Sequence, residues 1–205
     1  MITPAFMFTI FMLTLGPIKT VPAFFAMTRD DAPPAMRSLA VRGTVAATVI
    51  SLVIAFVMTA VAASWRLSPD DIRIAGGILL FGASRETIGQ IGRSASSPFI
   101  APATHPSVTP LAVPIIVTPW GVTAILFFVE LAQGDPRMSA IVIAALLLTM
   151  LLNLLGMLLA RRIIACAGMI GFQVVGWIFA VMQAGLAVDS VITSLRHLGV
   201  FHPAS

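Results

Sequence analysis

Leu15-Gly16-Pro17-Ile18-Lys19-Thr20-Val21-Pro22 interrupts an apolar run that extends over residues 2–27. A second motif, Val113-Pro114-Ile115-Ile116-Val117-Thr118-Pro119-Trp120-Gly121, interrupts an apolar run over residues 108–131, half a chain further on. Proline lacks a backbone donor and clashes with the preceding turn, so each motif is expected to break its helix. At membrane depth a broken helix is tolerated only where its freed backbone groups face protein or a wet cavity. Matching breaks in the two halves of a chain are typical of a transporter's binding site.

The composition is that of a polytopic membrane protein. Hydrophobic residues make up 59% of the chain and charged residues 10%, and the mean hydropathy is +1.03. A soluble domain carries about 25% charged residues. The isoelectric point is near 11.0, but the net charge is only +4 and the basic residues are scattered singly, so a nucleic-acid-binding surface is not indicated. Cys166 is the only cysteine, which excludes an intrachain disulfide and a thiolate metal cluster.

Six segments are long and apolar enough to cross a bilayer, for which a helix needs about 20 apolar residues. They cover residues 2–27, 39–64, 72–92, 108–131, 138–160 and 165–188, with turn-forming residues between them. The sequence therefore predicts an all-α polytopic membrane protein that forms a single membrane domain over residues 1–205. Of its six transmembrane helices, the first and the fourth are broken.

The two halves of the chain repeat the same order of segments. Each has a broken span, an intact span and a glycine-bearing span, with Gly76 and Gly77 in the first half and Gly171 and Gly176 in the second. Three spans is an odd number, so the second half must enter the membrane from the opposite side, as in an inverted repeat. The first repeat is expected over residues 1–93 and the second over residues 108–197. A loop over residues 94–107 joins them, and residues 198–205 form a short tail.

Arginines in the short loops indicate the orientation in the membrane, because basic residues favour the inside. With the N-terminus outside, the inside loops hold Arg29, Arg37, Arg42, Arg85, Arg93, Arg161 and Arg162, and the outside holds Arg66, Arg73, Arg137 and Arg196. This distribution favours both termini outside.

Lys19 is the only lysine of the chain and lies in the middle of the first apolar run. A buried ammonium is costly in a membrane and needs a partner, so an intramembrane lysine indicates a functional site. The alternative is that its stem extends to an interface. Desolvation favours the neutral form of a lysine, which leaves a role in proton coupling open.

Further polar residues lie beside the two breaks. The hydroxyls of Thr20, Thr118 and Thr123 could contact a solute or bond back to their own helices. The half-helices that begin after each break present positive N-terminal ends, which suit a carboxylate, so the motifs fit a small zwitterion. We expect substrate contacts from Lys19, Thr20, Thr118, Trp120, Thr123 and Gln183, and a site backbone shaped by Gly16, Pro17, Pro22, Pro114, Pro119 and Gly121.

Arg85 and Glu86 lie in the second half of the third span, where they could pair, gate a cytoplasmic opening or stand at the interface. Together with Ser84 they also offer the residue types of a membrane lipid-phosphate hydrolase. Other enzymatic signals are poor, because the histidines lack metal-ligand spacing and there is no Gly-x-Ser-x-Gly or phosphate-loop motif. The sequence predicts a protein that is not an enzyme and has no cofactor or metal, with the hydrolase as a weaker alternative.

At these motifs the chain resembles the MarC family of integral membrane proteins. That family carries Asp-Pro-x-Gly-Asn-x-Pro in its first span, where this chain has Gly16-Pro17-Ile18-Lys19-Thr20-Val21-Pro22. Its third span is similar to Arg73-Ile74-Ala75-Gly76-Gly77-Ile78-Leu79-Leu80-Phe81, and its fourth to Pro110-Leu111-Ala112-Val113-Pro114 through Pro119. The glycine and glutamine of its sixth span resemble Gly176 and Gln183. The resemblance covers almost the whole chain.

The resemblance implies a six-helix transporter of the bacterial inner membrane, with small neutral amino acids as substrates and export favoured. This chain departs from the family at Gly16, which stands for an acid, at Lys19 and Trp120, which stand for glycines, and at Thr20, which stands for an asparagine. If the family's acid helps to bind a coupling cation, Lys19 could supply a tethered charge in its place or pair with a substrate carboxylate.

The sequence therefore predicts a secondary transporter that moves a small polar solute by alternating access around a midplane site. Its expected partners are a small-molecule substrate and the lipid bilayer, and no nucleic acid. Proton or sodium coupling and a homo-oligomer stay open. A scaffold or signalling protein without transport is the alternative function.

Overall fold

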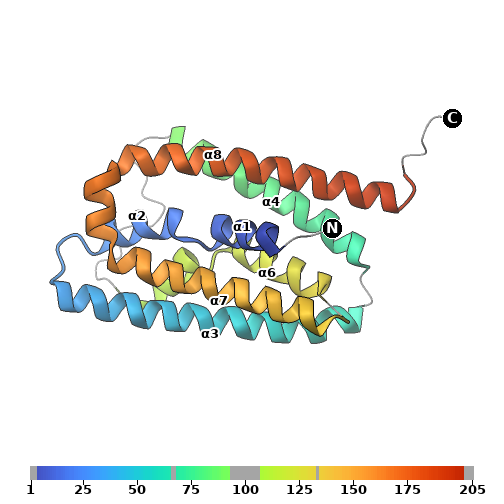
Figure 1. Cartoon of the computed structure of the whole chain (residues 1–205), viewed down its shortest axis with the longest axis horizontal. Helices are drawn as coiled ribbons and strands as arrows, with labels where there is room; N and C mark the ends of the chain where they lie inside the picture. Colours follow the sequence, from blue (N-terminus) through green and yellow to red (C-terminus); the bar gives the residue numbers. More distant parts are fainter. Residues whose placement is uncertain (1–3, 66–67, 93–106, 133, 201–205) are drawn as a thin grey trace.

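A computed structural model of the chain describes residues 4–65, 68–92, 107–132 and 134–200. Over these ranges every regular element is a helix, as the sequence predicts (Figure 1). The elements are α1 (Pro4–Thr14), α2 (Pro17–Met27), α3 (Pro33–Trp65), α4 (Pro69–Gly92), α5 (Val108–Pro110), the π-helical turn η1 (Leu111–Ile116), α6 (Pro119–Leu131), α7 (Pro136–Leu158) and α8 (Ala160–His197). Most of the predicted loop over residues 94–107 lies outside the described residues.

Four stretches of the described residues are long and apolar enough to cross a membrane. They are Pro4–Met27, Pro33–Val57, Pro136–Leu158 and Val174–His197. Shorter apolar stretches occur in α4 (Arg73–Gly82) and in α6 (Pro119–Leu131). Large apolar side chains such as Phe56 and Val181 are exposed on the outer helices, which suits a surface that faces lipid. The described helices thus form a multi-pass membrane protein with four candidate spans.

The helices begin where the sequence provides caps. Ser68 Oγ accepts from the Asp71 N–H at 3.1 Å and Asp71 Oδ2 accepts from the Ser68 N–H at 3.1 Å, which is a reciprocal capping box at the start of α4. Asp135 Oδ1 accepts from the backbone N–H groups of Arg137 and Met138 at the start of α7. Ser68 and Asp135 are therefore the capping residues of α4 and α7.

Ser68→Ala is expected to lower the free energy of unfolding by about 0.5–2 kcal/mol, because it removes the acceptor of this cap. Thermal unfolding of the detergent-solubilised protein measures the effect. Ser64→Ala is the control, since the Ser64 hydroxyl donates to Val61 within its own helix. Equal melting temperatures for both variants would contradict the capping role.

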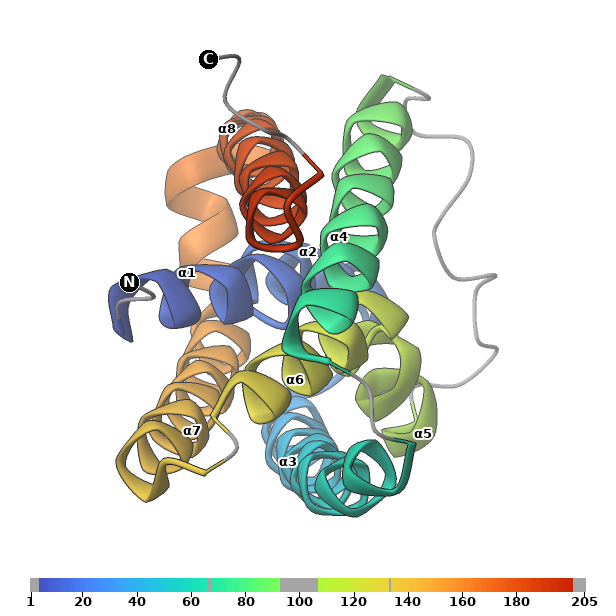
Figure 2. The ribbon, with the colours of Figure 1, turned by 90° about the vertical axis from the view of Figure 1, so that its right-hand side faces the viewer.

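The broken segments occupy the centre of the bundle. In both views α1, α2 and α6 lie between α4 and α8 on one side and α3 and α7 on the other (Figures 1 and 2). The long helices run in opposite directions in each pair, α3 against α7 and α4 against α8 (Figure 1). The contacts cross between the halves of the chain, because α1 and α2 pack on α7 and α8 while α6 packs on α3 and α4.

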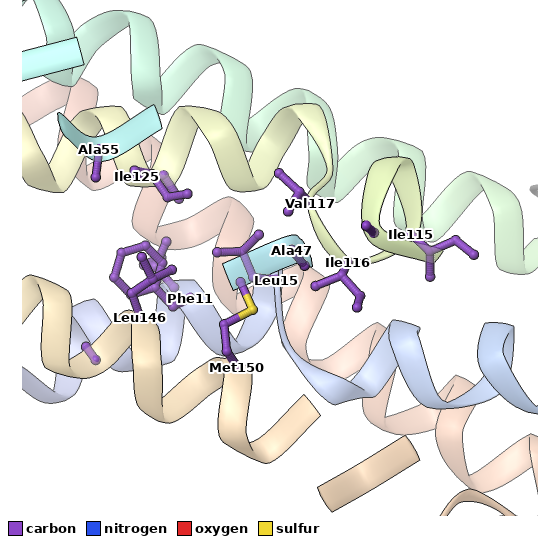
Figure 3. Packing of buried hydrophobic residues seen from close by; sticks show 14 of the residues in the cluster. Phe11, Leu15, Ala47, Ala55, Ile115, Ile116, Val117, Ile125, Leu146 and Met150 are labelled. Atoms are coloured by element: carbon purple, nitrogen blue, oxygen red, sulfur yellow. The ribbon is translucent and has the colours of Figure 1, made fainter. Parts of the chain in front are cut away.

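One apolar cluster joins the broken segments to the surrounding helices. Leu15 of the first break and Val117 of the second project into this cluster, together with Met150 of α7 (Figure 3). Phe128 of α6 meets Phe11 of α1 edge-on, with 5.2 Å between ring centroids. Burial at this centre fixes how the two halves pack, since close-packed interiors tolerate little change in side-chain volume.

Glycines allow the close approach of α4 to α8 and the bend within α8. A Cβ atom on Gly77 would lie 2.8 Å from the Ala187 carbonyl oxygen, so only glycine allows this packing. Gly168 has φ 67° and ψ 163°, a conformation that other residues rarely adopt, and α8 turns sharply there (Figure 1). The last helix, expected over residues 165–188, therefore bends at Gly168 and continues to His197.

Candidate functional site

The first break lies between α1 and α2, at the position that the sequence predicts. Helix α1 ends at Thr14, Gly16 has the extended angles φ −79° and ψ 176°, and Pro17 begins α2. A Cβ atom on Gly16 would overlap the Met12 carbonyl group, so any side chain here would force the backbone to shift. Pro17 fits the first position of a helix because its missing N–H would have no helical partner.

The second break extends from Val113 within η1 to the start of α6. Val113 has the extended angles φ −138° and ψ 123°, as expected for a residue that precedes a proline. Thr118 is also extended, with φ −88° and ψ 160°, and its hydroxyl oxygen accepts from the Gly121 N–H at 3.1 Å. Pro119 then begins α6, so Thr118 is the N-cap of this helix.

The two breaks are in direct contact. The Thr118 hydroxyl donates to the Thr14 carbonyl oxygen at 3.0 Å, which joins the start of α6 to the end of α1. The Leu15 side chain lies against Gly121, where an added Cβ would be 2.8 Å from Leu15 Cγ. A polar contact and an apolar contact therefore hold the motifs together.

Lys19 reaches across to the second break. Its Nζ donates to Thr118 Oγ1 at 3.2 Å, and the side chain is half-buried. The helix N-termini that follow the two breaks, at Pro17 and Pro119, add partial positive charge to that of the ammonium. The electrostatics at this contact favour an anionic group.

Side chains satisfy the carbonyl groups that the first break frees. The Thr14 oxygen accepts from Thr118, the Leu15 oxygen accepts from Asn153 Nδ2 of α7 at 2.5 Å, and the Gly16 oxygen accepts from Thr20 Oγ1 at 3.1 Å. Asn153 is fully buried. The sequence motifs do not include it, although an asparagine inside an apolar run is a signal that it bonds another helix.

The remaining predicted contact residues are dispersed. Thr20 and Thr123 donate to carbonyls one turn back in their own helices, Thr123 to Pro119 at 3.1 Å. The Trp120 ring lies beside Gly82 of α4, where an added Cβ would be 3.4 Å from Trp120 Cη2. Gln183 Nε2 donates to the Leu80 carbonyl at 3.4 Å, so it links α8 to α4. These contacts bring Lys19 and Thr118 together but do not join the other four residues to them.

Pro22 does not break its helix, because α2 continues through it to Met27. Arg85 is exposed, whereas the Ser84 hydroxyl is buried and donates to Leu80 within α4. The Glu86 side chain lies outside the described part of the structure, and so does the pairing expected for it. Pro114 belongs to the π-helical turn η1, and it therefore lies at the second break, where the sequence predicts it.

Residues 3–198 match the family model described as MarC family integral membrane protein. The chain belongs to the MarC family. The family resemblance seen in the motifs is thereby confirmed, and with it the assignment to the membrane. The MarC match covers both breaks and every candidate span.

Relatives of this chain carry the name UPF0056 membrane protein. The relative from Methanocaldococcus jannaschii is 28% identical over 188 residues, which cover 89% of this chain and 90% of the relative. The relative from Archaeoglobus fulgidus is 25% identical over 194 residues, or 92% and 90% of the two chains. The relative from Pyrococcus abyssi is 24% identical over 182 residues, 88% of each chain. The comparison with solved structures found no match.

Proposed function

We propose that this MarC protein is a secondary transporter of small polar solutes, with small neutral amino acids as substrates. The observation that carries the proposal is the position of Thr118. Its hydroxyl caps α6, donates to the carbonyl end of α1 and accepts from the Lys19 ammonium. One side chain thus joins two broken helices from opposite halves of the chain, which is the arrangement expected of a transport site.

Alternating access needs two bundles of helices that rock around the site. We propose that two inverted repeats, each of three membrane spans, provide these bundles. In this architecture α4 and α6 complete the six spans. The crossed packing supports it, since the broken segment of each half packs on the second and third helices of the other half. The opposed directions of α3 and α7 and of α4 and α8 are those of two inverted copies (Figure 1).

The chemistry of the breaks suits a small zwitterion. The Lys19 ammonium and the N-termini of α2 and α6 would attract a carboxylate. The carbonyl groups of Thr14 and Leu15 each keep a second lone pair that could accept from an ammonium group. Leu15 and Gly121 are in close contact, so a large solute would have to separate the breaks. These features favour alanine, glycine, serine and threonine.

We further propose that the Lys19 ammonium takes the place of a coupling cation, so that transport needs no sodium. The proposal also gives the direction of transport as export and the location as a bacterial inner membrane. Both termini are proposed to lie on the outer side of that membrane. Direction and membrane follow from the family resemblance, and the orientation follows from the distribution of arginines.

The test is counterflow of labelled amino acids in liposomes that contain the purified protein. Thr118→Val is expected to lower counterflow at least tenfold, because it leaves the Thr14 carbonyl and the Lys19 ammonium without this partner, at about 1–3 kcal/mol each. Thr149→Val is the matched control. Thr149 is fully buried, but its hydroxyl donates to Ala145 in its own helix at 2.8 Å.

Saturable counterflow that Thr118→Val reduces and Thr149→Val preserves would support the transporter. No flux of any amino acid from folded protein would favour a scaffold or signalling role instead. The hydrolase alternative requires Ser84, Arg85 and Glu86 to converge, and the buried Ser84 hydroxyl bonded to Leu80 does not support it.

A further inference from the structure

Ser51 of α3 and Asn153 of α7 are the two residues from which this inference starts. Both are fully buried. Among the residues that the structure describes, neither Ser51 Oγ nor Asn153 Oδ1 has a hydrogen-bond partner. An unpaired buried oxygen costs free energy, so each such group requires an explanation.

The two residues occupy equivalent positions in the proposed repeat. Asn153 follows Ser51 by 102 residues, the same separation as between Pro17 and Pro119 at the two breaks. The same separation relates the buried positions of the two helices. On α3 these are Ala40, Ala47, Ser51 and Ala55, and on α7 they are Val142, Thr149, Asn153 and Met157. Equivalent faces of α3 and α7 are therefore buried.

Asn153 forms a hydrogen bond to a break, whereas Ser51 does not. Asn153 Nδ2 donates to the Leu15 carbonyl oxygen and so ties α7 to the first break. Leu15 is equivalent to Val117, which lies 102 residues further on, directly before Thr118 in the second break. Helix α3 packs on η1 and α6, so Ser51 belongs to the helix that contacts the second break. Within the described ranges its hydroxyl makes no such bond.

Each end of the bundle has a feature that bears on how the halves move. A groove of about 610 Å³ opens between the end of α3, the end of α6 and the start of α7, with Ala55 and Val142 in its lining. At the other end, Arg161 Nη2 donates to the Asp31 carbonyl at 2.7 Å and ties the second half to the turn after α2.

We propose that Asn153 and Ser51 are paired positioning residues that hold the two breaks in turn. In the conformation described, Asn153 holds the first break. In the alternate conformation the halves exchange roles, so that the Ser51 hydroxyl donates to the Val117 carbonyl and Asn153 releases Leu15. This inference rests on the proposed transport by an inverted repeat. Each residue acts through a backbone carbonyl and not on the solute.

The test measures conformation rather than flux. Spin labels are placed in the full chain after Cys166, which is exposed, is replaced by serine. One label pair, at positions 57 and 137, spans the groove, and a second pair, at positions 30 and 162, spans the opposite end; all four positions are exposed. Pulsed electron spin resonance gives both distance distributions in liposomes without solute.

The exchange variant Ser51→Asn with Asn153→Ser is expected to shorten the groove distance and lengthen the opposite one, so that the minor population of the wild type becomes the major one. Asn153→Ser alone should shift the populations part of the way. Thr149→Ser is the control and should shift neither, since Thr149 bonds within its own helix.

Ser51→Ala provides a second test of the pairing if the exchange variant does not fold. It removes only the hydroxyl, so it should keep the wild-type distances without solute and reduce the change that alanine induces. Wild-type distributions in a folded exchange variant, or an unreduced response in Ser51→Ala, would overturn the pairing. Counterflow is measured separately, so a failure of transport is distinguishable from a failure of this inference.

Discussion

Lys19→Met is expected to lower amino-acid counterflow by about 10- to 100-fold, because a hydrogen bond that involves a charged group contributes about 1.5–3 kcal/mol and about 1.4 kcal/mol corresponds to a factor of ten. Methionine keeps the apolar stem of the side chain but removes the ammonium that contacts Thr118. The loss should appear mainly as a raised KM, since in the proposed site the charge binds the carboxylate of the solute. Concentration series of labelled alanine in proteoliposomes measure it.

Lys19→Arg is the matched control, since it retains the positive charge and should retain most of the counterflow. The wild type should work equally well with and without a sodium gradient if the ammonium replaces a coupling cation. An unchanged KM and an unchanged response to proton and sodium gradients in Lys19→Met would remove Lys19 from both the binding and the coupling roles.

Gly121→Ala is expected to lower the stability of the protein and its counterflow together. The added Cβ would lie 2.8 Å from Leu15 Cγ and would overlap the outer part of that side chain. Overpacking of this kind costs about 1–3 kcal/mol, and here it would also separate Thr118 from the Thr14 carbonyl. Thermal unfolding in detergent and counterflow should both fall.

Leu15→Ala combined with Gly121→Ala should recover part of the loss, because it removes the side chain that the new methyl group strikes. Gly185→Ala is the control, since an added Cβ there meets no atom within 4 Å; in a helix this change is expected to be neutral or to stabilise. Additive effects of the two substitutions would show that the Leu15–Gly121 contact does not hold the breaks together.

The breaks and helix starts could be predicted because their causes are local. Proline acts on its own turn, and Ser68 and Asp71 cap a helix within one turn, so both effects can be read without tertiary structure. The bend at Gly168 could not be predicted in this way. A glycine in an apolar run is equally consistent with close helix packing, as at Gly77, and only the tertiary structure selects between the two.

The site was predictable only in part for the same reason. The position of Lys19 beside a break follows from the sequence, but its contact with Thr118 spans 99 residues. Thr20 and Thr123 bond within their own turn because a carbonyl always lies within reach of a helical threonine. Asn153 bonds a residue 138 positions away, and no local pattern specifies such a partner.

The Thr118 hydroxyl has no hydrogen-bonding capacity left. A hydroxyl group can donate once and accept twice, and here it donates to Thr14 and accepts from Lys19 and Gly121. An arriving solute can therefore reach this oxygen only by displacing one of these three groups. The lysine is the only side chain among them, so it is the group that can swing aside and return when the solute leaves. For a carrier this means that, in the unloaded protein, the half-buried lysine is hydrogen-bonded by the protein's own atoms. The empty return step then requires no substitute ligand, and such a carrier can complete its cycle without exchanging one solute for another.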